Sequence, residues 1–159
     1  MKQQKIARLL EAFTFLTMII TALFCFWIIP EGMNMAIENF PELESMHFIG
    51  YICSFILFLL CCSALINFKK ICHNIGLGNS FCKNNAKHMK IITNIALSVF
   101  IFFIICFIIL YVNHFVSGPL IVWGIFIEFF VSGITILCYA LTQLIENACD
   151  IQEENNLTI

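Results

Sequence analysis

SVFIFFIICFIIL, residues 98–110, decides the fold class of this chain. The stretch contains no charged residue, no glycine and no proline, and it lies within a longer apolar block, residues 91–112. It lacks the polar–apolar alternation that marks a strand. Since hydrocarbon offers no water to backbone N–H and C=O groups, such a segment satisfies them internally as a helix. The stretch predicts a membrane helix, and its bulky residues on all sides predict the most lipid-exposed helix of the chain.

Three further blocks of the same character occur in the 159-residue sequence. Apolar types make up 61% and charged types 11% of the residues, against about one quarter charged residues in ordinary globular proteins. Each block is near or above the roughly 20 residues that cross a bilayer as a helix. The four blocks are residues 9–29, 48–68, 91–112 and 119–144. We predict an all-α, integral membrane four-helix bundle that forms a single domain over residues 1–159.

The positive charges predict how the bundle is oriented. All eight lysine and arginine residues fall at the N-terminus or in the second connection. They are Lys2, Lys5, Arg8, Lys69, Lys70, Lys83, Lys87 and Lys90. Basic loops of membrane proteins are retained in the cytoplasm. We therefore expect a multi-pass protein whose N-terminus and C-terminus both lie in the cytoplasm.

The second connection, residues 69–90, contains the turn sequence GLGNS. We expect the preceding helix to end at Gly76 or Gly78 in a left-handed conformation. Asn79 or Ser80 then offers a side-chain oxygen that caps the next helix. The result is an amphipathic cytoplasmic elbow, residues 69–90, whose lysines are attracted to anionic lipid by about 1 kcal/mol each.

Residues 145–159 extend the fourth block as a predicted amphipathic acidic tail. The chain ends in NLTI, an apolar composition that is unusual for an end surrounded only by water. The elbow carries the opposite charge and is one candidate contact of the tail. We predict an interaction surface formed by elbow and tail; its residues are Phe81, Lys83, Lys87, Lys90, Glu153, Glu154, Leu157 and Ile159.

Two motifs resemble the bacterial domain-of-unknown-function family 2975. They are IGLGNSFCKNNAKHMKII, residues 75–92, and LIENACDIQEENNLTI, residues 144–159. Ser80 stands where the family usually has proline, and Asn156 where it usually has aspartate. The resemblance implies a bacterial plasma-membrane protein without assigned chemistry, often encoded beside a small helix-turn-helix regulator. We therefore expect a regulatory or interaction protein that recruits such a regulator to the elbow and tail.

Glu128 is the ionisable residue deepest in the apolar blocks, roughly 13 Å along its helix from Pro119. Helical spacing places small and polar residues on its face, namely Gly124, Ser132 and Thr135. We expect the partners of Glu128 to come from a matching stripe on the first helix, namely Thr14, Thr17 and Thr21. The carboxyl then serves either as a proton- or cation-responsive group or as neutral glue between helices.

A small transporter or a self-protection protein that uses Glu128 is the alternative function. A thiol enzyme is disfavoured because Cys61 and Cys62 point apart on a helix and no C-x-x-C motif occurs. Cys72, His73, Cys82 and His88 match no compact zinc spacing. We therefore expect no enzyme activity, no metal and no cofactor. Because the net charge is −2, we also expect no direct nucleic-acid binding. The expected partners are therefore the lipid bilayer and a protein.

Overall fold

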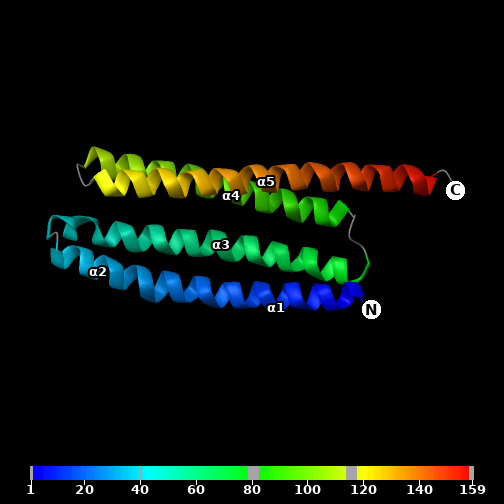
Figure 1. Cartoon of the computed structure of the whole chain (residues 1–159), viewed down its shortest axis with the longest axis horizontal. Coiled ribbons are helices and arrows are strands. Elements are labelled where there is room, and N and C mark those ends of the chain that lie inside the picture. The colour runs from blue at the N-terminus through cyan, green and yellow to red at the C-terminus, as the bar shows by residue number, and fades with distance from the viewer. Residues whose placement is uncertain (1, 40, 79–82, 114–117, 158–159) are drawn as a thin grey trace.

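The computed structural model describes residues 2–39, 41–78, 83–113 and 118–157, with side chains for residues 5–39, 41, 43–78, 83–113, 118, 121–151 and 154 (Figure 1). Helices make up the described chain, and it holds no strand. They are α1 (Lys2–Leu23), the π-helical turn η1 (Phe24–Ile28), α2 (Ile29–Asn39), the 3-10 helix η2 (Pro41–Met46), α3 (His47–Gly76), α4 (Lys83–Val112) and α5 (Gly118–Leu157). Four helical segments are long and apolar enough to cross a membrane: Lys5–Asn39, Leu43–Gly76, Lys83–Val112 and Ile121–Ile151.

The long helices pack in the order of the sequence. α1 packs on α3, α3 on α4, and α4 on α5, with the α1–α3 pair and the α4–α5 pair forming two layers (Figure 1). Among the described residues, α1 and α5 have no Cα atoms within 8 Å of each other, so one side of the bundle is not closed. The expectation that residues 98–110 form the most lipid-exposed helix is wrong, because α4 lies between two neighbours whereas α5 packs on α4 alone.

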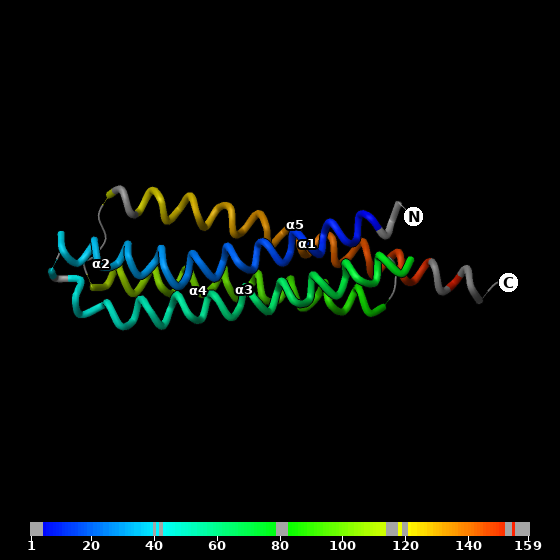
Figure 2. Tube along the Cα trace, turned by 90° about the horizontal axis from the view of Figure 1, so that it is seen from below, coloured from blue at the N-terminus to red at the C-terminus, as the bar shows by residue number. Residues whose placement is uncertain are grey.

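One end of the bundle collects the basic segments. It holds the start of α1, the end of α3, the start of α4 and the end of α5, and we call it the lysine-rich end (Figures 1 and 2). α5 contains 40 residues and is therefore about 60 Å long. Its C-terminal part projects beyond the ends of the other helices, as the red segment in Figure 1 shows.

The predicted block 9–29 implied that the first helix ends before Pro30. In the structure the helical segment continues through this proline. Proline has no N–H group, and its ring crowds the carbonyl four residues earlier. The preceding turn is widened, and the Ile29 N–H bonds to the carbonyl of Phe24, five residues back. This π-helical turn carries the helix into α2, so much of the predicted first connection is helical.

The turn between α3 and α4 confirms part of the prediction for the elbow. Gly78 has a φ of +84°, and its N–H bonds to the carbonyl of Ile75 at 3.0 Å. α3 therefore stops in a left-handed glycine, as the sequence predicts. The predicted caps Asn79 and Ser80 lie outside the described residues. The described elbow residues on either side of this turn belong to the end of α3 and the start of α4, which lie side by side (Figure 1).

Buried side chains concentrate toward the lysine-rich end. They are Ala7, Thr14, Asn67, Ile71, Cys72, Asn85, Ala86, Met89, Thr93, Thr142 and Cys149, with Cys25 and Ser54 nearer the other end. The apolar residues of the bundle's middle are mostly exposed, especially along α5. Lipid solvates such side chains, so a membrane helix packs through only part of its surface.

Candidate functional site

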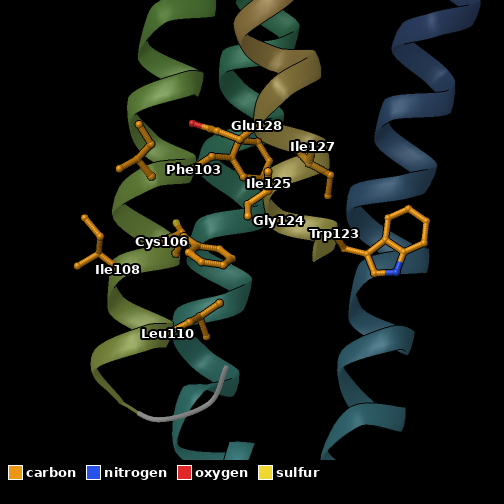
Figure 3. A pocket seen from close by; sticks show the side chains of 11 residues that line it. Phe103, Cys106, Ile108, Leu110, Trp123, Gly124, Ile125, Ile127 and Glu128 are labelled. Atoms are coloured by element: carbon orange, nitrogen blue, oxygen red, sulfur yellow. The ribbon is translucent and has the colours of Figure 1, made fainter. Parts of the chain in front are cut away.

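A cavity of about 520 Å³ lies between α4 and α5. Among the described residues its walls are apolar except at Glu128, which reaches from α5 past Phe103 toward α4 (Figure 3). The Oε1 atom of Glu128 is buried and has no hydrogen-bond partner among the described residues. Buried polar atoms normally have a hydrogen-bond partner, so a carboxyl oxygen without one makes this cavity a candidate functional site.

The polar residues on the face of Glu128 do not bond to it. The Ser132 hydroxyl donates to the carbonyl of Phe129, and the Thr135 hydroxyl donates to the carbonyl of Val131, each at 2.8 Å. Both hydroxyls are satisfied within α5 itself. The residues of the predicted stripe lie on one face of α5, but their hydroxyls do not bond to the Oε1 atom of Glu128.

The predicted partnership between Glu128 and the first helix is wrong. The hydroxyls of Thr14, Thr17 and Thr21 donate to the carbonyls of Leu10, Phe13 and Thr17, at 2.7, 2.8 and 2.8 Å. Among the described residues, no Cα atom of α1 lies within 8 Å of a Cα atom of α5 either. Threonine in a helix commonly bonds the carbonyl four residues earlier, so these hydroxyls need no partner on another helix.

Gly124 allows α4 to approach α5 beside the cavity. A Cβ atom built on Gly124 would collide with the ring of Phe107 on α4. Small residues let membrane helices pack closely, and here the missing side chain accommodates an aromatic ring. The same glycine therefore shapes one wall of the cavity.

Asparagine side chains link α3 to α4 at the lysine-rich end. Asn85 is fully buried, and its Oδ1 accepts from the Nδ2 of Asn74 at 2.7 Å. One helical turn further along α4, the Nδ1 of His88 lies 2.9 Å from the Oδ1 of Asn67. Because a carbonyl oxygen only accepts, the proton sits on Nδ1 of this histidine.

A third polar pair extends this network to α5. The hydroxyls of Thr93 and Thr142 lie 2.9 Å apart and are buried. We call the side chains of Asn67, Asn74, Asn85, His88, Thr93 and Thr142 the polar cluster. The sequence interpretation missed it, although a signal exists: Asn67, Ile71 and Asn74 share one helical face. The cluster fixes the register of three helices at the end that carries the lysines.

The predicted interaction surface is described only in part. Lys83, Lys87 and Lys90 are exposed and share one flank of α4. Glu154, on the projecting end of α5, is also exposed. The side chains of Phe81, Glu153, Leu157 and Ile159 lie outside the described residues.

The candidate metal ligands of the elbow do not converge. Cys72 is fully buried, whereas His73 is exposed and its Nδ1 lies 3.5 Å from Glu11 Oε1. His88 belongs to the polar cluster, and Cys82 lies outside the described residues. Within the described chain no three His, Cys, Asp or Glu residues are grouped as metal ligands.

One pair of thiols, missed by the sequence interpretation, joins α3 to α4 next to the cavity. The Sγ atoms of Cys53 and Cys106 lie 3.9 Å apart, and Cys106 also lines the cavity. Both residues belong to predicted membrane blocks, but nothing in the sequence indicates that they face each other. The pair therefore reports the packing of α3 on α4.

We expect copper phenanthroline to oxidise Cys53 and Cys106 to a disulfide in isolated membranes. The two thiols lose two protons and two electrons to the oxidant, and their sulfurs close to about 2.05 Å. Mass spectrometry of the digested protein should recover the cross-linked peptides, and Cys53→Ser should abolish them. Cross-linking of Cys106 to Cys138 at equal yield would contradict the observed packing.

Comparison with protein families gives a match over nearly the whole chain. A family model described as "Protein of unknown function (DUF2975)" matches residues 4–159, which confirms the resemblance indicated by the two motifs. No curated protein and no solved structure matches the chain.

Proposed function

This chain belongs to the DUF2975 family of proteins of unknown function, and we propose that it is a non-enzymatic regulatory protein of the bacterial plasma membrane. Its lysine-rich end faces the cytoplasm and recruits a small helix-turn-helix regulator. The observation that carries the proposal is the exposed flank of Lys83, Lys87 and Lys90 on the start of α4, at the same end of the bundle as the projecting end of α5.

The polar cluster supports this role because it holds the ends of α3, α4 and α5 in register. A rigid support reduces the conformational entropy lost when a partner binds. The flank is basic, and acidic residues occur on the tail, so the two segments together offer charges of both signs. Such a surface selects a partner through charge complementarity rather than through area alone.

Affinity purification of the full-length protein tests the proposal. A helix-turn-helix protein encoded by an adjacent gene should co-purify in mild detergent. Deletion of residues 152–159, or Lys87→Glu combined with Lys90→Glu, should reduce its recovery at least tenfold. Lys69→Glu with Lys70→Glu is the matched control, since it reverses two exposed charges at the same end, on α3. Equal recovery with the α4 variant and with this control would remove the flank from the mechanism, and absence of the regulator would refute recruitment.

Small-solute transport or self-protection is the second candidate function, and the unpartnered Oε1 of Glu128 favours it. A carboxyl inside a membrane bundle takes up or releases protons or cations as its surroundings change. Proton-dependent efflux or tolerance of a membrane-active agent should then be lost in Glu128→Gln. Efflux and tolerance that are unchanged in this variant would exclude the candidate.

A further inference from the structure

We propose that the cavity between α4 and α5 binds a hydrophobic organic cation, whose charge is held by the carboxylate of Glu128. The cavity combines apolar walls, the rings of Phe103 and Phe107, and one buried carboxyl oxygen without a hydrogen bond. Each of these features selects one property of the ligand.

The carboxyl selects the charge. All lysine and arginine residues lie within residues 2–8 and 69–90, and none of them lines the cavity. An isolated carboxylate in an apolar medium is strongly unfavourable, so Glu128 is neutral in the empty cavity or is compensated by a cation from outside the chain. A cation with an apolar body supplies the positive charge that the carboxylate lacks, and its apolar part fills the cavity.

The walls exclude a bare metal ion as the occupant. Hard cations such as Ca²⁺ require about six to eight oxygen ligands. Among the described residues that line the cavity, Glu128 is the one acidic side chain, and the hydroxyls of Ser132 and Thr135, further along α5, donate to carbonyls of that helix. Aromatic rings, by contrast, attract organic cations through their π faces.

The volume of about 520 Å³ selects the size of the ligand. Small-molecule pockets typically enclose about 300–1,000 Å³. The described residues that line the cavity belong to α4 and α5, and α3 lies on one side of it, where Cys53 meets Cys106. Among the described residues α5 has no Cα atom within 8 Å of any long helix except α4, so the side of the cavity away from α3 would open toward lipid. A hydrophobic cation that partitions into the bilayer therefore reaches it from the side.

This inference does not depend on recruitment of a regulator; it deepens the second candidate function and names its ligand class. Binding and transport are separable. Binding without uptake into proteoliposomes would exclude transport and still support the binding site. Uptake without saturable binding at Glu128 would exclude the binding site.

Equilibrium binding of tritiated tetraphenylphosphonium tests the proposal. The full-length protein is placed in nanodiscs of zwitterionic lipid, and empty nanodiscs correct for partition into the bilayer. We expect saturable binding of about one cation per chain, with at least tenfold weaker affinity in Glu128→Gln. Tetraphenylborate has the same shape and the opposite charge and, measured in separate samples because the two ions pair with each other, should not bind saturably.

Two further variants keep the test falsifiable. Glu128→Asp retains the charge and should bind within a fewfold of the native affinity, while Asp150→Asn removes an exposed acid from the same helix and should bind normally. Binding no greater than in empty nanodiscs, or equal affinity in Glu128→Gln, would overturn the proposal. Saturable binding of tetraphenylborate as tight as that of the cation would show an apolar cavity without charge selection and would overturn it as well.

Discussion

Asn85→Ala is expected to destabilise the protein by about 2–4 kcal/mol, since it removes a fully buried amide and leaves the amide of its partner on α3 without this hydrogen bond. The Nδ2 of Asn74, which donates to Asn85 at 2.7 Å, loses its acceptor. The substitution also leaves a void among the ends of the packed helices. Unfolding in mixed micelles, followed by tryptophan fluorescence, measures the loss as a shift of the midpoint.

Asn84→Ala is the matched control. Asn84 is the preceding residue on the same helix and is exposed, so the same atoms are removed without breaking the buried pair. We expect a change within about 0.5 kcal/mol. Similar destabilisation by the two substitutions would show that the polar cluster is not what holds α3 against α4.

Gly124→Leu is expected to separate α4 from α5 beside the cavity, at a cost of about 1–3 kcal/mol. Any side chain at this position collides with the ring of Phe107, which then must leave its place. The displaced ring exposes the partly buried Cys106, so its labelling by a maleimide should become faster.

Gly133→Leu adds the same atoms to the same helix, but a Cβ built there would meet no heavy atom of another helix within 4 Å. This control should leave both the unfolding midpoint and the labelling of Cys106 nearly unchanged. Equal effects of the two leucines would mean that loss of glycine, and not collision with Phe107, is responsible.

The membrane helices were predictable because their signal is local. In hydrocarbon, a uniform apolar block of about 20 residues can satisfy its backbone N–H and C=O groups only as a helix. The left-handed glycine at the end of α3 follows from the GLG sequence. The helix nevertheless continues beyond the predicted block 9–29, through Pro30. A proline breaks a helix only if the freed groups find no other partner, and the π-helical turn at Phe24–Ile28 provides one.

The side-chain pairs were not predictable because they depend on which helices touch. The sequence interpretation paired Glu128 with threonines of α1, whereas α5 packs on α4. Asn67 and Asn74 share one helical face, but the sequence does not show which helix that face meets, and Asn85 stands among polar residues that do not distinguish it. Lipid solvates the outer face as readily as protein does, so membrane helices lack the amphipathic pattern that identifies a packed face in water.

The orientation of the lysine-rich end is the claim on which the docking proposal depends, and reporter fusions test it most directly. Alkaline phosphatase fused after Gly78 should be inactive and a fluorescent protein fused there should glow, since basic segments remain in the cytoplasm. Fusions after Asn113 should give the opposite pattern. Active phosphatase after Gly78 would place the lysines outside the cell and contradict the account.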